Sequence, residues 1–342
     1  MKRVVTFGEI MLRLSPPGQE RFFQSPQLRT FFGGSEANTA ASLAHFGVRS
    51  EFVSRVPSNA IGDAALAALR AEGVDVRGVV RGGERLGIYF VESGADLRDL
   101  RVVYDRAGSA FSQLAPGALD WKELLSGADW FHVSGITPAL GEGPAASARE
   151  AIEAARALDV RVSIDLNYRP ALWGGRNPRA TMQPLVQGCD VLIGNPGAVA
   201  AMLGITTAGT GPEPPEALRE TAARLHAELG CGQVALTRRE VLSASEHGWS
   251  AVLYDGATGA LHVSRRYQVR LVDRVGGGDS FAAGLIHALL DGRTAESALE
   301  FATAASALKL TIPGDFNRIS ADEAERLLGL PDAPSSRSQI SP

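Results

Sequence analysis

The sequence predicts an α/β fold with a mostly parallel sheet flanked by helices on both faces. Two observations carry this prediction. Short apolar runs bounded by turn residues alternate with Ala/Leu/Glu-rich stretches of helical character, and only two segments interrupt the alternation. Strands that alternate with helices form parallel sheets, whose ligands bind beyond the carboxyl ends of the strands. The chain has 342 residues, 45% of them hydrophobic, which is enough for a full-sized core.

The elements are expected in alternating order along the chain. Strands are expected at 3–10, 50–56, 128–135, 161–167, 190–195, 232–237 and 266–272. Helices are expected at 36–47, 63–73, 147–158, 177–188, 216–229 and 279–292. Glycine ends several of these helical stretches, as at Gly47, Gly73 and Gly292, and glycine is the usual residue just past a helix C-terminus.

Two segments contain strand-like pieces without a crossover helix. Residues 11–32 and 86–106 are typical of β hairpins, and together they are expected to form a small sheet that covers the site. Residues 206–216 form a Pro/Gly/Thr-rich loop. The tail at 331–342 is polar and rich in Pro and Ser, which predicts disorder. Residues 1–330 are therefore expected to form one domain with the two β segments inserted.

Charge and cysteine usage limit the possible partners. The net charge of −4 argues against a nucleic acid or an anionic membrane, because either partner calls for a basic surface. Cys189 and Cys231 fit neither a metal spacing nor a disulfide framework, so a reducing, cytoplasmic location is expected. Glu9 and Arg13 break the apolar run that a signal peptide requires, and no stretch reaches the length of a membrane span.

The stretch DRVGGGDSFAAG at 273–284 is the first candidate site. It lies between a strand-like run and a helical run, so its glycines fall at a helix N-terminus. There, free backbone N–H groups and the positive end of the helix dipole bind anions, and glycine lets the backbone approach a phosphate closely. Asp279 follows in the first helical turn. The motif alone also fits an aspartate that only caps the helix, and it is not a P-loop.

A second glycine-rich stretch, FFGGSEANTA at 31–40, favours a ligand site. Gly33 and Gly34 follow an apolar strand and precede a helix that contains Asn38. This arrangement suits close approach of a polyhydroxy ligand to the backbone. It lies far from DRVGGGDSFAAG in the sequence, so the two stretches together indicate one composite site.

These two stretches resemble the N-terminal and C-terminal signatures of the ribokinase-like PfkB family of carbohydrate kinases. The resemblance extends from TFGEIML through about residue 330. Within the family, YDRAGSA, DLNYRPALW and IPGDFN are similar to the kinases of 2-keto-3-deoxygluconate. The resemblance implies a ribokinase-like fold with a small β-sheet lid. It also implies ATP-dependent phosphorylation of 2-keto-3-deoxygluconate at its terminal hydroxyl, giving 2-keto-3-deoxy-6-phosphogluconate.

The resemblance assigns the chemistry to four consecutive residues. Asp279 is expected to be the base that accepts the proton of the attacking hydroxyl. The backbone N–H groups across Gly276, Gly277 and Gly278 are expected to form the anion hole for the transferring phosphoryl group.

An acidic sugar needs a partner for its carboxylate, and the planar fork of arginine suits this task. By the resemblance, Arg106 and Arg169 take this role, Tyr89 and Tyr104 line the sugar pocket, and Asp315 holds a substrate hydroxyl. The expected substrate-binding residues are Gly34, Asn38, Tyr89, Tyr104, Arg106, Arg169, Asp279 and Asp315.

The resemblance implies ATP and Mg²⁺ and leaves open whether a monovalent cation is also needed. The expected nucleotide-binding residues are Asn167, Arg169, Asn195, Thr237, Gly276 and Gly278, and no residue is expected to bind a metal directly. Two positions depart from the family pattern. Ala198 stands where a glutamate usually helps to hold Mg²⁺ through water, and a Thr-x-Gly pattern reads Thr237-Arg238-Arg239.

Three alternatives stay open at the level of sequence. The chain is a kinase for the sugar acid, a kinase for a neutral sugar such as fructose or ribose, or a catalytically weak regulatory relative, which the two departures favour. His45, His132 and His287 have no partners at metal-ligand spacing and are expected to be structural. A homodimer through the lid, or a higher homo-oligomer, is expected because the family pairs such lids edge to edge.

Overall fold

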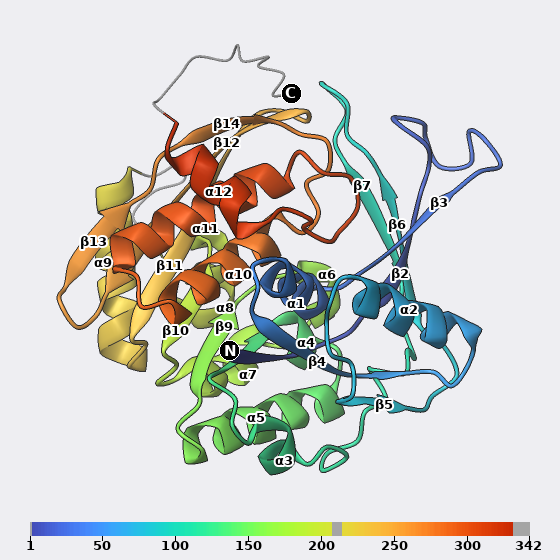
Figure 1. Cartoon of the computed structure of the whole chain (residues 1–342), viewed down its shortest axis with the longest axis horizontal. Coiled ribbons are helices and arrows are strands. Elements are labelled where there is room, and N and C mark those ends of the chain that lie inside the picture. The colour runs from blue at the N-terminus through green and yellow to red at the C-terminus, as the bar shows by residue number, and fades with distance from the viewer. Residues whose placement is uncertain (1, 207–213, 331–342) are drawn as a thin grey trace.

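A ten-stranded sheet forms the centre of the described part of the molecule (Figure 1). The structure is a computed structural model, and it describes residues 2–206 and 214–330. The strand order is β13-β12-β11-β10-β9-β8-β1-β4-β5, and β14 pairs with β12. In this spatial order, the strands from β11 through β10, β9, β8, β1 and β4 to β5 pair parallel with one another. Strands β12, β13 and β14 pair antiparallel. The expected fold class is therefore confirmed.

Apolar runs bounded by turns form six of the parallel strands, as expected. These are β1 (Arg3–Phe7), β4 (Arg49–Val56), β8 (Trp130–Ser134), β9 (Arg161–Asp165), β10 (Val191–Gly194) and β11 (Gln233–Ser243). The short parallel edge strand β5 (Val79–Arg81) was not expected. The antiparallel strands are β12 (Glu246–Asp255), β13 (Ala260–Val263) and β14 (Tyr267–Arg270). Strand β11 runs beyond the expected 232–237 because it continues into a hairpin with β12.

Helices cover both faces of this sheet. One face carries α3 (Trp121–Leu125), α5 (Glu142–Ala157), α7 (Pro178–Val186), α8 (Pro196–Leu203) and α9 (Pro215–Leu229). The other carries α1 (Ser35–His45), α10 (Gly277–Leu290), α11 (Ala295–Lys309) and α12 (Ala321–Leu328). In Figure 1, α10 to α12, orange to red, lie opposite the green α3 and α5. Three further helices are α2 (Ala60–Ala71), α4 (Ile136–Ala139) and α6 (Pro170–Trp173).

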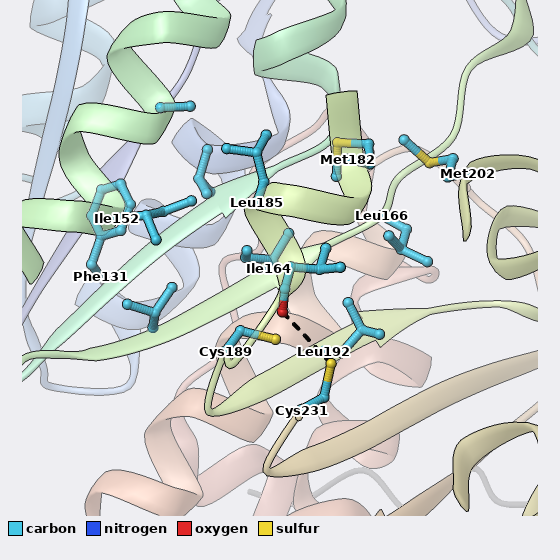
Figure 2. Packing of buried hydrophobic residues seen from close by; sticks show 14 of the residues in the cluster. Phe131, Ile152, Ile164, Leu166, Met182, Leu185, Cys189, Leu192, Met202 and Cys231 are labelled. Carbon is cyan, nitrogen blue, oxygen red and sulfur yellow. Dashed lines mark hydrogen bonds between the residues drawn. The ribbon is translucent and has the colours of Figure 1, made fainter. Parts of the chain in front are cut away.

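Successive side chains of the buried strands enter opposite layers of the core. In β10, Leu192 packs in one cluster, while Val191 and Ile193 pack in the other. Figure 2 shows Leu192 among Ile164, Cys189 and other apolar side chains of the first cluster. Both cysteines are free and buried in this layer.

The two β segments that break the alternation form a separate four-stranded sheet. Its order is β3-β2-β6-β7, with bounds Met11–Ser15 for β2, Arg29–Gly33 for β3, Gly87–Glu92 for β6 and Arg101–Asp105 for β7. The β2–β3 and β6–β7 pairs are antiparallel, while β2 and β6 run parallel. This small sheet, called the lid sheet below, stands beside the central sheet on the right of Figure 1.

All six expected helices are present, with some changes of boundary. Helices α2 and α5 begin before the expected 63 and 147, and helices α3, α4, α6, α8, α11 and α12 were not expected. Gly47, Gly73 and Gly292 have φ values of 80°, 84° and 74°, the left-handed conformation expected just past a helix. The expected tail at 331–342 and most of the loop at 206–216 lie outside the described residues. No helix in residues 2–206 and 214–330 has the length and apolar character of a membrane span.

Helices α10 and α11 approach closely at Gly284, and this contact yields a prediction. A Cβ atom at Gly284 would lie 2.9 Å from the Cα of Ala302, so Gly284→Ala must push the helices apart. We expect urea unfolding to show a loss of about 1–3 kcal/mol in the free energy of unfolding. Gly329→Ala is the control, because its nearest new contact is 3.7 Å and its φ is −70°. It should change stability by less than about 0.5 kcal/mol. Equal stability of the two variants would contradict the packing argument.

Candidate active site

A cavity of about 1320 Å³ lies at the carboxyl ends of the parallel strands, next to the lid sheet. Its wall contains residues from the central sheet, the lid sheet, the start of α1 and the start of α10. All of the residues expected from the sequence to act in catalysis or binding line it: Gly34, Asn38, Tyr89, Tyr104, Arg106, Asn167, Arg169, Asn195, Thr237, Gly276, Gly277, Gly278, Asp279 and Asp315. The structure thus brings both glycine-rich stretches into one site.

The triple glycine enters α10 as a tight turn. Gly276 is the N-cap residue and has φ 83° and ψ −4°, a left-handed conformation that favours glycine. A Cβ at Gly277 would lie 2.8 Å from Leu310. At Gly278 a Cβ would meet no atom within 4 Å, and this residue lines the cavity. The open space beside Gly278 and the free N–H groups of the first turn together fit an anion.

Asp279 is held by side chains from two other elements. Ser35 Oγ donates to one carboxylate oxygen at 2.8 Å, and Asn38 Nδ2 donates to the other at 2.7 Å. Asn167 Nδ2 donates to Ser35 Oγ at 2.7 Å and lies 3.5 Å from the carboxylate. Asn38 therefore contacts Asp279 directly, which its expected role in sugar binding does not explain. Asn167 has φ 37°, and its side-chain contacts offset this strained backbone.

The surroundings make Asp279 a stronger base than an exposed aspartate. Burial raises the pKa of Asp279, and the hydrogen bonds from Asn38 and Ser35 oppose the rise. The charges of Arg169 and Lys309 also oppose it. The carboxylate is thus desolvated but oriented, the state that proton abstraction from a hydroxyl requires.

Asp165 was missed at the level of sequence, although it ends the buried strand β9. It lines the cavity and is 7% exposed. Burial and the charge of Asp279 raise the pKa of Asp165 to about 7. Its position in VSIDLN, at the end of an apolar strand, was the available signal. Such a carboxylate is stabilised by any cation that enters the cavity.

The lid sheet contributes Tyr89, Tyr104 and Arg106 to the cavity. The rings of Tyr89 and Tyr104 stack with centroids 5.9 Å apart, and the Arg106 guanidinium lies 5.6 Å from the centre of the Tyr104 ring. Arg106 forms an ion pair with Glu9, a buried residue that sequence reasoning did not select. Ser109 also donates to Glu9. Arg106 therefore already has a carboxylate partner within the protein.

Asp315 forms part of a buried ion-pair network that the sequence did not predict. Arg13, on β2 of the lid sheet, contacts Asp315 at 2.9 Å and Asp273 at 2.8 Å. The Tyr89 hydroxyl also donates to Asp315. Burial alone would lower the pKa of Arg13, but the charges of Asp315 and Asp273 raise it overall. The signal was an arginine on the same strand face as Met11 and Ser15, both of which are buried.

Asp273 in turn fixes the loop before the triple glycine. It accepts hydrogen bonds from the backbone N–H groups of Val275 at 3.1 Å and Gly314 at 3.0 Å. Arg13 thus connects the lid sheet to both loops that shape the floor of the cavity.

A second part of the cavity wall, called the basic end below, carries three arginines. Arg169, Arg239 and Arg274 line it, and all three are exposed to solvent there. Among the described residues, none of the three forms an ion pair with a carboxylate. Partial burial and the charge of Arg169 lower the pKa of Arg239. Partial burial and the charges of Arg239 and Arg274 lower the pKa of His247 to about 4. Mutually repelling guanidinium groups of this kind fit a polyanion.

The other expected nucleotide-binding side chains already have contacts in the protein. Asn195 caps α8 by accepting a hydrogen bond from the N–H of Ala198 at 3.0 Å. Thr237 donates to the carbonyl oxygen of Gly194 at 3.1 Å. Both residues line the cavity wall next to the three arginines.

Comparisons of the sequence and of the structure with known proteins agree with one another. The sequence model of the family described as "pfkB family carbohydrate kinase" matches residues 1–322. The crystal structure of a 2-dehydro-3-deoxygluconokinase from Thermotoga maritima is similar with a TM-score of 0.92 and 45% identity, covering 96% of this chain and 99% of that chain. A 2-dehydro-3-deoxygalactonokinase of Haloferax volcanii is 31% identical over 330 residues, which are 96% of this chain and 98% of the relative. A 2-dehydro-3-deoxygluconokinase of Thermoproteus tenax is 32% identical over 335 residues, which are 96% of this chain and 94% of the relative.

The buried network around Arg13 yields a prediction for stability. Arg13→Met leaves Asp273 and Asp315 without their shared cation, so the free energy of unfolding should fall by about 3–5 kcal/mol in urea titrations. Arg29→Met is the matched control. Arg29 lies over the same Phe31 ring, at 5.5 Å compared with 5.2 Å for Arg13, but it is exposed on β3. Arg29→Met should lower the free energy of unfolding by less than about 1 kcal/mol. Equal losses in the two variants would show that the ring contact and not the ion pairs stabilises this region.

Proposed function

Because the chain belongs to the pfkB family of carbohydrate kinases, we propose that it phosphorylates 2-keto-3-deoxygluconate at the terminal hydroxyl with ATP. The product is 2-keto-3-deoxy-6-phosphogluconate. The observation that carries the proposal is the position of Asp279. It lies beside the glycine turn at the start of α10, in a cavity that has a basic end and a lid sheet with an arginine. Phosphoryl transfer needs such a base, an anion site and exclusion of water.

Asp279 accepts the proton of the terminal hydroxyl as its oxygen attacks the γ-phosphorus. The backbone N–H groups at Gly276, Gly277 and Gly278 receive the charge that develops on the transferring group. Ser35 and Asn38 keep the carboxylate pointed at the hydroxyl, because each holds one of its oxygens. The proton then resides on Asp279 until solvent takes it.

The nucleotide phosphates occupy the basic end of the cavity. Arg169, Arg239 and Arg274 offset the charge of the triphosphate, since each lacks a carboxylate partner among the described residues. Asn167, Asn195 and Thr237 flank this end and contact the nucleotide. Gly276 and Gly278 approach its terminal phosphate.

Mg²⁺ fits this arrangement as an ion that arrives with ATP. The described residues contain no group of three or more His, Cys, Asp or Glu side chains suited to a metal. Mg²⁺ in kinases keeps several waters and uses one or two carboxylates together with the phosphates. Asp165 is the residue that would hold it, because its carboxylate lines the cavity beside Asp279, and burial and the charge of Asp279 raise its pKa to about 7. When bound, the ion neutralises charge on the β- and γ-phosphates.

The sugar acid lies between the lid sheet and α1. Its carboxylate binds Arg169 and the edge of Arg106, whose Nε has no hydrogen-bond partner in the described residues. Tyr89 and Tyr104 pack against the carbon chain, Gly34 and Asn38 line the other side, and Asp315 accepts a hydroxyl hydrogen bond.

A neutral sugar is the second candidate, and one observation favours it. Glu9 already neutralises Arg106, which leaves Arg169 as the stronger attraction for a substrate carboxylate. A neutral ketose or pentose would leave the Arg106–Glu9 pair undisturbed. The charge preference of the substrate separates the two candidates.

The lid sheet also supports a homodimer. Its edge strands are β3 and β7, and the exposed apolar residues near them include Phe23 at 75% and Val103 at 42%. We propose pairing between two lids through these edges, since unpaired edges favour association. We also propose a cytoplasmic location, because free buried cysteines suit a reducing compartment.

A substrate panel tests the proposal. The native protein with ATP and Mg²⁺ should release ADP with 2-keto-3-deoxygluconate or its galactonate epimer, and far less with gluconate, fructose or ribose. Arg169→Leu should lower kcat/KM for the keto-acid by about 10–100-fold, the effect of losing a charged hydrogen bond, and should lower kcat/KM for neutral sugars far less, since these lose only the contribution of Arg169 to ATP binding. Turnover with only a neutral sugar would support the second candidate. Equal losses for acidic and neutral substrates would remove the carboxylate role of Arg169.

The base is tested by Asp279→Asn. We expect kcat to fall by about 10²–10⁴-fold while ATP still binds with near-native affinity in calorimetry. Asp291→Asn is the control, because Asp291 is half-exposed at the other end of α10 and should leave kcat unchanged. Near-native turnover of Asp279→Asn would show that another group takes the proton.

A further inference from the structure

Lys309 is a buried cation that the proposed mechanism does not yet use. The 34 basic residues of the chain include only three lysines, and Lys2 and Lys122 are exposed. Lys309 ends helix α11 and has no exposed surface. Lysine is almost never fully buried without a partner, because removing an ammonium group from water costs free energy. A chain that uses arginine almost everywhere else therefore places a compact point charge at this one buried position.

The ammonium group lies beneath the glycine turn. Lys309 Nζ donates to the carbonyl oxygen of Ile312 at 3.2 Å. Its Cε lies 3.1 Å from the position that a Cβ of Gly276 would occupy, so the side chain passes directly behind this residue. The cation also stands at the C-terminus of α11, where the helix dipole favours positive charge. The lysine side chain thus lies against Gly276, the first residue of the glycine turn, and is not part of the cavity lining.

Three aspartates near Lys309 oppose the effect of burial on its ammonium group. Burial lowers its pKa, while the charges of Asp273 and Asp315 oppose this shift, Arg13 adds to it, and Asp279 opposes it. No carboxylate of the described residues lies within ion-pair distance of Nζ. The positive charge is therefore shared among three aspartates instead of being neutralised by one.

Charge balance at the site depends on this lysine. Arg13 and Lys309 carry two positive charges, and Asp273, Asp279 and Asp315 carry three negative charges. Without Lys309, the group beneath the turn would gain a further net negative charge, at the place where an anionic phosphate must approach. Charges in a partly desolvated site act strongly over such short distances.

We propose that Lys309 is a positioning residue. Its ammonium group, beneath the Gly276–Gly278 turn, supplies the positive charge that keeps this turn able to bind a phosphoryl group. Phosphoryl transfer therefore needs no dissolved monovalent cation. An alkylammonium resembles K⁺ in charge and NH₄⁺ in hydrogen bonding, and here it is covalently tethered. The inference rests on the proposed kinase function for its catalytic consequence. Its effect on phosphate binding does not require that a particular sugar be the substrate.

The first experiment exchanges the monovalent cation. Initial rates of the native protein should agree within about twofold in K⁺, Na⁺ and tetramethylammonium chloride at equal ionic strength. A rate that rises tenfold or more with K⁺ over tetramethylammonium would overturn the proposal. If no sugar in the panel is phosphorylated, the proposed function fails. ATP affinity by calorimetry in the same three salts then decides the present inference by the same criterion.

The second experiment removes the ammonium group. Lys309→Ala should lower kcat by about 10²-fold, as for loss of one preorganised charge at an anion site. Added NH₄⁺ or methylammonium should raise the kcat of Lys309→Ala at least fivefold, and tetramethylammonium should not. Lys309→Met fills the same space without charge, so its kcat should fall without rescue, and ATP affinity should fall more than AMP affinity. A folded Lys309→Met with native kcat and native ATP affinity would overturn the proposal.

Thr303→Val is the matched control for disturbing this helix. Thr303 is fully buried two turns earlier in α11 and donates to the carbonyl oxygen of Leu299 at 2.8 Å. Its variant should keep native kcat and show no response to NH₄⁺. Thermal unfolding of all variants separates loss of fold from loss of charge. If Lys309→Ala does not fold, Lys309→Met and the cation exchange on the native protein still decide the question.

Discussion

The guanidinium of Arg13, buried between Asp273 and Asp315, holds the candidate active site together. Its two ion pairs connect the lid sheet to the loop before α10 and to the loop after α11. Asp273 then fixes the backbone at Val275 and Gly314, and Gly276 packs against the main chain of Asp315. A buried ion pair of this kind adds little net stability but leaves few alternative arrangements when its geometry is complete. Arg13, which lies in the lid sheet, thus helps to fix the position of the glycine turn.

The cavity brings buried carboxylates and several guanidinium groups into one site. Burial and the charges of Asp279 and Glu36 raise the pKa of Asp165 to about 7, and burial raises the pKa of Glu36 to about 7. Partial burial and the charges of Arg239 and Arg169 lower the pKa of Arg274. In the proposed function, a triphosphate bound at the arginines would relieve their mutual repulsion. Binding energy is therefore available for orienting the reacting groups.

The sequence was sufficient for elements whose signal is local. Alternating apolar runs and helical stretches predicted the parallel strands, and the glycine motifs at Gly34 and Gly276 predicted residues that meet in one cavity. The outer end of β11 was missed because it continues beyond a buried run into polar residues such as Arg239, where no alternation marks a strand. Strand β12 was also missed, although it is buried along most of its length. Arg13 and Lys309 were missed for a different reason. Arg13 pairs with Asp315, 302 residues away in the chain. The aspartates whose charges act on Lys309 lie 36 and 30 residues before it and 6 residues after it, and no local pattern shows that the fold brings these groups together.

The two departures from the family pattern change the charge of the phosphate end in the same sense. Ala198 removes a negative charge that the family usually places there, and Arg239 adds a positive charge where the family usually has glycine. Ala198 lies in the first turn of α8 and is fully buried, and its backbone N–H donates to the side chain of the N-cap residue Asn195. Arg239 reaches the cavity only because β11 extends into the hairpin with β12. In the proposed function, the phosphates would therefore meet a more positive part of the cavity wall than the family pattern provides. The departures that weakened the functional prediction at the level of sequence are therefore, in the folded chain, consistent with a site that binds a polyanion.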